Sequence, residues 1–353
     1  MKKFKVAIVG LGRISGNHFS EIGALPDMFK IVAMCDTDPE RIALRNQLTP
    51  GLKAYDSIDK LLKDDEIDMV TICTRHPDHV PMARKILAAG KIAVVEKPTA
   101  TSAKELENLI AYAKRIGGHL FFRHNRRYEA VFQKAKALMD SGIIGDVQYI
   151  KVHRCAGYCR RNDWMTMSDF CGGLLTNWGP HVIDHALQYL DSPVTEIWSD
   201  LRRTISVGDG DDLMKILIRG ANGRLADVEL SGCNALPGRQ LEIIGTRGCL
   251  VFDGGKQIEV RAVEPTIQFK KLKPHPGQPP FAYGNFDEKL EFVDSFYDVP
   301  QENLGQLWID LYNDVVKGIP TPVRPEQALA VMKVIDTVFR QNKWKPILSK
   351  WMK

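Results

Sequence analysis

The feature that most constrains the fold is an alternation of short apolar runs with segments of helical length over residues 1–122. The apolar runs are rich in Val and Ile, and several are too apolar for strands exposed on one face, which is typical of parallel strands buried on both faces. They comprise Phe4–Val9, Ile31–Cys35, Met69–Cys73, Ile92–Val95 and His119–Phe122. The helical segments between them include Pro39–Leu48, Pro77–Ala89 and Ala103–Ile116. This alternation predicts an α/β unit with a doubly wound parallel sheet.

After residue 122 the pattern changes to consecutive strand-like runs joined by Gly-rich turns, which predicts an α+β unit with a large, mostly antiparallel open sheet. Helix-like segments cover Glu129–Asp140 and Pro180–Leu190, and two more, Leu304–Lys317 and Glu326–Arg340, close the chain. The strand-like runs are Val147–His153, Val194–Thr204, Leu213–Ile218, Ala226–Ser231, Leu241–Ile244, Cys249–Phe252 and Ile258–Val263. A length of 353 residues fits two domains, which we predict at residues 1–122 and 123–353.

A glycine-rich turn, AIVGLGRISGNH, follows the first apolar run directly. Gly10 permits a tight turn, and Gly12 lets the backbone approach a pyrophosphate at the positive end of the following helix. Arg13 and Ile14 lie in the same turn and are assigned to the same site. Ser15 occupies the third glycine position of the G-x-G-x-x-G fingerprint, a departure that its small size makes tolerable. The turn predicts a dinucleotide-binding (Rossmann) domain.

Asp36 ends the second strand-like run, 24 residues after Gly12 and near the expected distance of about 20. A carboxylate there accepts hydrogen bonds from the ribose hydroxyls and repels a 2′-phosphate, so it favours NAD over NADP. Thr37, Arg41 or Arg75 could instead recruit that phosphate, which leaves NADP open. The plainer alternative is a connecting turn, with Asp36 serving only to cap the next helix.

A second motif, Glu96-Lys97-Pro98, follows a strand of the same predicted sheet. The segment GKIAVVEKP (90–98) is a buried strand ending in Glu-Lys-Pro, at the edge where open α/β sheets bind ligands. Together with the glycine turn and the G-x-H-x-x-D of GGLLTNWGPHVIDHAL (172–187), it resembles the Gfo/Idh/MocA oxidoreductases over essentially the whole chain. Other matching segments are VTICTRHPDHVPMARKILAA (70–89), SGIIGDVQYIKVH (141–153), LEIIGTRGCLVFDG (241–254) and VKGIPTPVRPEQALAVMKVID (316–336).

The resemblance implies a Rossmann domain, a nicotinamide cofactor, and a sugar, cyclitol or related polyol as substrate. It also implies a C-terminal domain whose open sheet joins subunits into a homodimer or homotetramer. The segments 121–142 and 177–190 look most like the branch that contains scyllo-inositol dehydrogenases. Within the segment 70–98, Thr74, His76 and His79 are assigned to the cofactor site.

Lys97 matches the family lysine, whose ammonium stabilises alkoxide character on the reacting hydroxyl. Glu96 is assigned to orient Lys97 and to border the cofactor, and the family suggests a cis bond before Pro98. His181 matches the family histidine. Because Pro180 marks a helix start, the positive end of that helix favours neutral imidazole, a base in oxidation and an acid in reduction.

Asn177 is the main departure from the family, whose competent members often carry Asp four residues before the histidine. Asn cannot carry the negative charge that would stabilise a protonated His181, but it can hydrogen-bond substrate or the imidazole ring. Asp184, three residues beyond His181, either orients substrate or serves the structure, and both readings stay open.

Further residues are assigned to substrate. Trp164 and Trp178 offer an apolar face to a sugar ring, and Arg161 binds hydroxyls, although a surface or interface loop is an equal alternative. Arg123 and Arg127 follow the last strand of the first domain and are expected to border the pocket.

Composition narrows the class of partner. The net charge of +5 is dispersed, so no nucleic-acid surface is expected. No run approaches a membrane span, and the N-terminal apolar stretch is too short for a signal peptide, which predicts a cytoplasmic protein. The seven cysteines include no CxxC pair, which favours reduced thiols. A zinc site from His153, Cys155, Cys159 and Cys171 has loose spacing, and we expect no metal.

The sequence therefore predicts an NAD(P)-dependent oxidoreductase acting on CH–OH groups. Two alternatives remain. One is a non-enzymatic NAD(P)-binding regulator, which the loss of the carboxylate at Asn177 would favour. The other is a lyase or glycosidase that oxidises and re-reduces one carbon.

Overall fold

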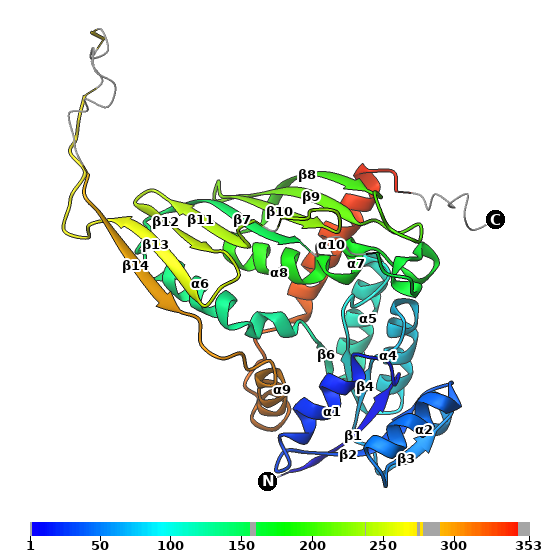
Figure 1. Cartoon of the computed structure of the whole chain (residues 1–353). Helices are drawn as coiled ribbons and strands as arrows, with labels where there is room; N and C mark the ends of the chain where they lie inside the picture. Colours follow the sequence, from blue (N-terminus) through cyan, green and yellow to red (C-terminus); the bar gives the residue numbers. More distant parts are fainter. Residues whose placement is uncertain (1, 156–159, 237, 274–275, 278–289, 345–353) are drawn as a thin grey trace.

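A computed structural model describes residues 2–155, 160–236, 238–273, 276–277 and 290–344, and it contains two sheets (Figure 1). The first sheet has six strands, all parallel, in the order β3-β2-β1-β4-β5-β6. Its strands are β1 (Phe4–Val9), β2 (Phe29–Cys35), β3 (Lys53–Tyr55), β4 (Met69–Ile72), β5 (Ile92–Val95) and β6 (Leu120–Phe122). The order reverses between β1 and β4, which creates the switch point where such sheets bind ligands.

Helices flank this sheet, and in three of the five a side chain caps the first turn. Asp38 accepts a hydrogen bond from the Glu40 N–H at 2.9 Å, and Ser102 accepts one from the Glu105 N–H at 3.2 Å. Gly117 ends the longest of these helices in the left-handed conformation, with φ +64°. The helices are α1 (Ser15–Gly23), α2 (Pro39–Leu48), α3 (Ile58–Leu61), α4 (His79–Ala88) and α5 (Ala103–Ile116).

The second sheet has eight strands in the order β14-β13-β12-β11-β7-β10-β9-β8. Its strands are β7 (Val147–Cys155), β8 (Val194–Arg202), β9 (Leu213–Gly220), β10 (Leu225–Ser231), β11 (Leu241–Gly245), β12 (Gly248–Phe252), β13 (Gln257–Val263) and β14 (Phe292–Asp298). Neighbours are antiparallel except the central pair β7 and β10. Helices α6 (Ala130–Asp140), α7 (Leu174–Asn177), α8 (Gly179–Leu190) and α10 (Pro325–Gln341) lie on one side of this sheet (Figure 1).

The other face of the second sheet carries exposed aromatic side chains. Tyr149 on β7 is 52% exposed and Trp198 on β8 is 56% exposed. Lys151 on β7 and Lys215 on β9 lie on the same face, since each points away from the buried residues beside it, so this face is mixed rather than purely apolar.

The last helices of the chain return to the first sheet. On α9 (Gln306–Lys317), Trp308 and Tyr312 pack edge-on against Phe29, with ring centroids 6.0 and 5.9 Å away, and Tyr312 also meets Phe4 at 5.8 Å. The indole N–H of Trp308 donates to Glu21 on α1 at 2.9 Å. Helix α10 contacts α5 and β6. The first sheet is therefore closed by residues from the far end of the sequence.

The predicted fold class is confirmed. The sequence prediction missed two strands, β3 and β14, and did not distinguish the parallel pair at the centre of the second sheet. β3 is three residues long and follows a turn, so it shows no apolar run. The Pro- and Gly-rich stretch predicted as a surface loop (272–285) falls largely outside the described residues.

Candidate active site

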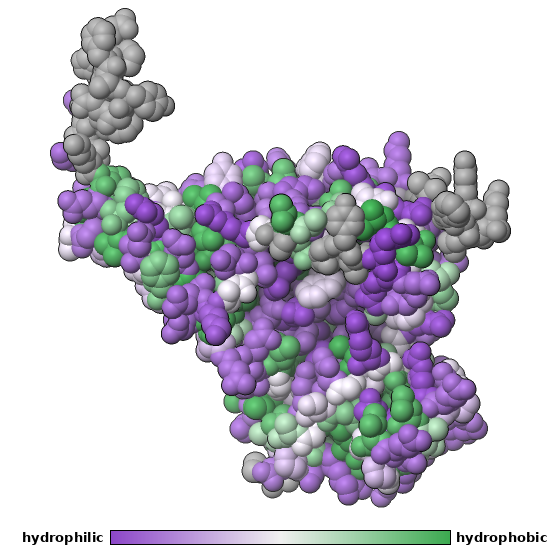
Figure 2. Space-filling view, in the orientation of Figure 1, coloured by the Kyte–Doolittle hydropathy of each residue, from purple (hydrophilic) through white to green (hydrophobic). Residues whose placement is uncertain are grey.

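A cleft of about 660 Å³ lies at the carboxyl ends of β1, β2, β4 and β5 and is closed by the segment around residues 161–165 and by Asn177. Figure 2 shows a mostly hydrophilic hollow between the parts of the molecule that carry the two sheets. The predicted site residues that line the cleft are Gly10, Gly12, Arg13, Ile14, Asp36, Thr74, His76, His79, Glu96, Lys97, Arg161, Trp164 and Asn177.

The glycine turn forms one end of the cleft. Gly10 has φ +87°, and a side-chain carbon there would lie 2.7 Å from the main chain of Cys73 on the neighbouring strand end. The Ser15 hydroxyl donates to the Gly12 carbonyl at 2.7 Å and closes the turn. Within the described residues, the N–H groups of Gly12, Arg13 and Ile14 have no acceptor. These free donors at the start of α1 are suited to an anionic group.

Asp36 lies beside this turn, as predicted from its spacing. One carboxylate oxygen accepts the Leu11 N–H at 2.7 Å and the other accepts the Asp38 N–H at 3.0 Å, which fixes the carboxylate at the cleft. Arg41 is also close. Its guanidinium lies 3.4 Å from where a side-chain carbon on Gly12 would be, and it pairs with Asp38 at 3.3 Å. This end of the cleft therefore holds both a carboxylate and a cation.

Lys97 lies at the end of β5, and the peptide bond between Lys97 and Pro98 is cis. Its Nζ donates to the Asn177 carbonyl at 2.8 Å and to Asn177 Oδ1 at 3.1 Å. An ammonium has three donors, so one remains for a ligand. Burial lowers the pKa of Lys97 to about 8; Glu96 acts against this shift and Arg126 adds to it. Lys97 is therefore a well-held donor that can lose its proton near neutral pH.

Glu96 is adjacent to Lys97 but its carboxylate is bound elsewhere. It accepts from His18 at 2.9 Å, from Arg123 at 2.7 Å and from the Lys97 N–H at 3.1 Å. Burial alone would raise the pKa of Glu96, but Arg123 and His18 lower it overall. Arg123 also donates to Glu21 at 2.6 Å and is only 1% exposed. Arg123 was predicted to border the substrate pocket; it lies instead in this buried ion-pair network.

His181 lies in the first turn of α8, where its N–H donates to the Trp178 carbonyl at 3.0 Å. It is buried next to the cleft rather than on its lining. Its Nδ1 is enclosed and has no partner among the described residues. Burial, followed by the charges of Lys97 and Arg126, lowers the pKa of His181 well below its ordinary value. The ring is therefore neutral and available as a proton acceptor.

Arg127 and Asp184, both assigned to substrate, form a buried ion pair away from the cleft. Arg127 Nε and Nη2 donate to the two Asp184 oxygens at 2.7 and 2.6 Å. Arg127 also binds the Pro322 carbonyl at 2.8 Å. The pair joins the start of the second unit to α8 and to the segment before α10. Of the two readings for Asp184, this geometry fits the structural one.

His124 is a buried neighbour of this pair. Its Nδ1 lies 4.0 Å from Asp184, too far for a hydrogen bond, and neither ring nitrogen has a partner among the described residues. Burial lowers its pKa, so the ring is neutral. A buried ring without partners is costly.

His76 and His79, both predicted to bind the cofactor, use ring nitrogens to contact main-chain carbonyls of other segments. His76 Nδ1 lies 3.0 Å from the Cys171 carbonyl, and its ring meets Trp164 edge-on at 4.9 Å. His79 Nδ1 lies 2.8 Å from the Pro98 carbonyl. The two histidines thus tie the cleft wall to the segment after β7 and to the residue after Lys97.

Arg126 was not among the residues predicted from the sequence. Its guanidinium carbon lies 4.4 Å from the Trp178 ring centre, and it pairs with Glu129. Arg126 and Arg127 lie in the 3-10 turn Asn125–Tyr128, where successive side chains point about 120° apart. Arg127 therefore faces inward and Arg126 faces Trp178. The aromatic residue at Trp178 was the available signal, because arginine often stacks on tryptophan.

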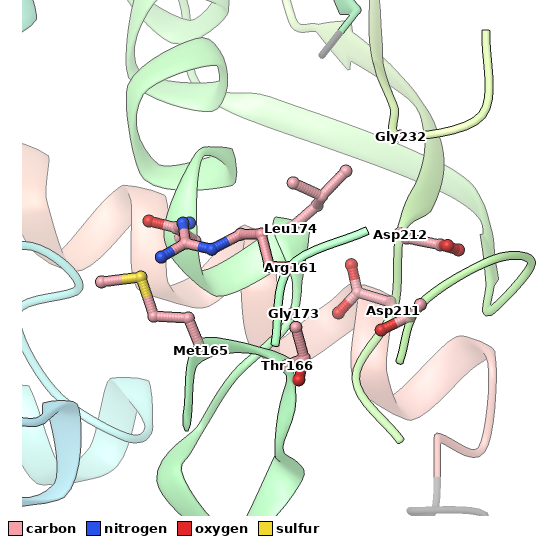
Figure 3. A pocket seen from close by; sticks show the side chains of 10 residues that line it. Arg161, Met165, Thr166, Gly173, Leu174, Asp211, Asp212 and Gly232 are labelled. Atoms are coloured by element: carbon pink, nitrogen blue, oxygen red, sulfur yellow. The ribbon is translucent and has the colours of Figure 1, made fainter. Parts of the chain in front are cut away.

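A small pocket adjoins the cleft and shares Arg161, Met165 and Asn177 with it (Figure 3). Its far wall carries Asp211, which is buried. Burial raises the pKa of Asp211 to about 7. One oxygen accepts the Leu175 N–H at 2.8 Å, so Asp211 holds the start of α7, which carries Asn177.

The described part of the chain bears on the predictions about a metal and a membrane span. No group of three or more His, Cys, Asp or Glu side chains is arranged there to hold a metal ion. Cys159, one member of the zinc alternative, lies outside the described residues. None of the described helices is long and apolar enough to cross a membrane.

Comparison with known proteins places this geometry in a family. A model described as an oxidoreductase family with an NAD-binding Rossmann fold matches residues 4–124, and a GFO/IDH/MocA C-terminal domain model matches residues 132–251. The chain belongs to the Gfo/Idh/MocA oxidoreductase family. It is accordingly an NAD-dependent oxidoreductase, with the NAD-binding Rossmann fold of this family at its N-terminal end.

Family members with assigned names are similar across most of the chain. The D-apiose dehydrogenase of Paraburkholderia graminis is 26% identical, and the match covers 74% of this chain and 70% of that protein. The myo-inositol 2-dehydrogenase of Thermotoga maritima is 23% identical, with 72% and 77% covered. A solved oxidoreductase from Agrobacterium radiobacter, in complex with NAD+, L-tartaric acid and magnesium, shares the fold with a TM-score of 0.81 and 18% identity over 97% of each chain.

The residues present fit the nicotinamide cofactor of the Gfo/Idh/MocA family. Free N–H groups at Gly12, Arg13 and Ile14 suit a pyrophosphate, and the fixed Asp36 carboxylate suits ribose hydroxyls. The cleft continues from these groups to Lys97 and Asn177, so one ligand can reach both ends.

Proposed function

We propose that the protein moves a hydride between nicotinamide and a secondary alcohol or ketone carbon of a sugar, cyclitol or related polyol. The observation that carries this proposal is Lys97, which is held by Asn177 at the inner end of the cofactor cleft with one donor free. The names of the two similar dehydrogenases support a sugar or cyclitol substrate.

The chain's own residues supply binding and proton transfer, and the bound nicotinamide supplies the hydride acceptor. Lys97 Nζ donates to the reacting oxygen, and Asn177 fixes Nζ through two hydrogen bonds. His181 receives the hydroxyl proton, directly or through one water. Its Nδ1 is enclosed, which leaves Nε2 for this exchange. In the reverse direction, the same nitrogen returns the proton to the carbonyl oxygen.

The direct test is absorbance near 340 nm with NAD and a panel of sugars and polyols. Lys97→Ala should abolish turnover of any active substrate, because it removes the donor to the reacting oxygen. Lys114→Ala is the control. Lys114 is exposed near the C-terminal end of α5, and this helix end lies at the amino ends of the parallel strands, whereas the cleft is at their carboxyl ends. Unchanged turnover in Lys97→Ala would refute the mechanism. Tight NAD binding with no turnover would favour a regulator, and bond cleavage without net NADH would favour a lyase or glycosidase.

We also propose NAD over NADP as the working cofactor, because Asp36 places a fixed negative charge beside the ribose site. Asp36→Ala should lower the preference for NAD over NADP, since Arg41 remains nearby to bind a 2′-phosphate. The ratio of kcat/KM for the two cofactors measures this. A wild-type preference for NADP would contradict it.

We further propose that residues 1–122 and 123–353 act as the cofactor and substrate domains, and that the second sheet joins subunits as a homodimer or homotetramer. The exposed Tyr149 and Trp198 on its open face support this. Trp198→Glu should shift the mass measured by light scattering toward the monomer. An unchanged mass distribution in this variant, or a monomeric wild-type protein, would contradict the assignment.

A further inference from the structure

The substrate end of the cleft lacks a carboxylate for its lysine. Within the described residues, the side-chain ammonium of Lys97 contacts only the two Asn177 oxygens. The neighbouring Glu96 carboxylate is turned to His18 and Arg123, at 2.9 and 2.7 Å. The positive charge of Lys97 is therefore not neutralised by a direct partner.

Arg161 adds a second cation on the cleft lining. Its Nε and Nη2 bind a single oxygen of Asp163, at 3.2 and 2.6 Å, while the other Asp163 oxygen accepts the Met165 N–H. Nη1 has no partner among the described residues. Figure 3 shows the guanidinium pointing away from Asp211 and Asp212 on the far wall of the small pocket. One edge of this guanidinium is thus open to a ligand in the cleft.

Two more cations lie over Trp178, and they share one carboxylate. The guanidinium carbons of Arg126 and Arg154 lie 4.4 and 5.9 Å from the Trp178 ring centre, and both arginines pair with Glu129. Glu302 attracts both electrostatically but pairs with neither. Neither arginine lines the cleft, but Arg126 lies close enough to add positive potential at Lys97 and to lower its pKa.

We propose, building on the function proposed above, that the substrate is a polyhydroxy carboxylate such as an aldonate or uronate. Its carboxylate binds the open edge of Arg161 and is attracted by the charge of Lys97, whose one free donor holds the reacting oxygen. A planar guanidinium edge matches a carboxylate. Asn177 removes the negative charge that would repel such a ligand, so the departure from the family becomes a specificity feature. In the reaction, a secondary alcohol carbon gives its hydride to NAD+ and its hydroxyl proton to His181; the product is the keto acid, and the carboxylate is unchanged.

The test compares matched pairs of substrates: each sugar with its aldonate and its uronate, plus a sugar phosphate, with the whole protein and NAD. The acid should have kcat/KM at least about tenfold above its neutral partner, and Arg161→Gln should lower kcat/KM for the acid about tenfold more than for the neutral sugar. Arg160→Gln is the matched control, because Arg160 is an exposed neighbour with the same charge and does not line the cleft. Higher ionic strength should lower kcat/KM for the acid more than for the neutral sugar.

The outcomes separate this inference from the function it rests on. Equal or better turnover of neutral sugars would overturn the carboxylate assignment alone, as would an equal loss on both classes in Arg161→Gln. A preference for the sugar phosphate would also overturn it. Calorimetry of the enzyme–NADH complex with acid and neutral ligands gives a second readout: binding of the acid that depends on Arg161, without any turnover, would support the charge preference and refute the redox function.

Discussion

Lys97 owes its chemical character to burial more than to an ion pair. Its ammonium is held by neutral oxygens of Asn177, and its pKa falls to about 8, with burial as the main cause. His181 has a pKa well below 6.5, also mainly through burial. The two groups thus titrate on opposite sides of neutrality, which is the arrangement expected of an acid and base pair.

This separation predicts the pH dependence of catalysis. The required forms are protonated Lys97 and neutral His181, so kcat/KM should be flat around neutrality and fall as pH rises through about 8. Lys97→Arg should abolish this alkaline decline if any activity remains, because a guanidinium keeps its proton. A pH–rate profile in both proteins measures the effect. If kcat/KM instead fell as pH dropped through about 6.5, with no decline above about pH 8, the titrating group would be an ordinary histidine rather than Lys97.

Asn177→Asp tests the missing carboxylate. A negative charge at Oδ1, 3.1 Å from Lys97 Nζ, should raise the pKa of Lys97 and move the alkaline limb upward. It should also lower kcat/KM for carboxylate substrates relative to neutral ones, through repulsion in the cleft. Asn177→Ala is the control for loss of the amide alone. If the alkaline decline of kcat/KM occurred at the same pH in Asn177→Asp as in the wild-type protein, the side chain at position 177 would not control the pKa of Lys97.

The position of a residue at the cleft could be predicted where spacing within a short motif fixes it. Gly10, Gly12, Asp36 and Lys97 line the cleft because each sits at the end of a parallel strand, which the sequence reveals. The ion pairs of Arg123 and Arg127 could not be predicted, because their partners, Glu21 and Asp184, are far away in sequence. In a run of several arginines, only the tertiary partners decide which one reaches the site.

At the level of elements, predicted bounds were accurate where local chemistry ends a segment. Helices α2 and α5 begin after capping side chains and were predicted to the residue. β14 was missed because its alternation FVDSFYD comes shortly after the Pro- and Gly-rich segment 272–285, which was predicted to be a loop. The parallel pairing of β7 with β10 depends on contacts between strands about 75 residues apart, and no local pattern encodes it.

The strand-to-helix turn at Gly10 gives a prediction at this scale. Gly10→Ala should destabilise the protein by about 3 kcal/mol and weaken NAD binding, because the methyl group would meet the Cys73 backbone at 2.7 Å. Gly51→Ala is a matched control, since Gly51 has nearly the same φ of +86° but open space around it. It should cost only about 1 kcal/mol and leave NAD affinity unchanged. Denaturant unfolding and cofactor titration measure both, and equal effects would refute the contact argument.

For the whole molecule, buried neutral histidines predict sensitivity to acid. Six have pKa values lowered mainly by burial: His18, His76, His79, His124, His181 and His185. Below about pH 6.5 the unfolded chain binds protons at these sites and the folded chain does not, so stability falls as pH falls, by about 1 kcal/mol per histidine per pH unit. Asp211, with its pKa raised to about 7, and Asp336, whose pKa is also raised by burial, act in the opposite direction but are two groups against six.

Guanidinium unfolding at about pH 7.5 and about pH 5.5 measures this loss of stability. His124→Phe should be less acid-sensitive and at least as stable near neutrality, because it replaces a buried ring without partners by an apolar one. Equal stability at the two pH values would contradict the argument.

The return of α9 to the first sheet has a consequence for biosynthesis. Trp308 and Tyr312 complete the packing around Phe4 and Phe29, and Trp308 holds Glu21, which in turn holds Arg123. Some 300 residues separate these partners along the chain. The nucleotide-binding sheet therefore leaves the ribosome with an uncovered aromatic surface and an unfinished ion-pair network, and it matures only after α9 has been synthesised.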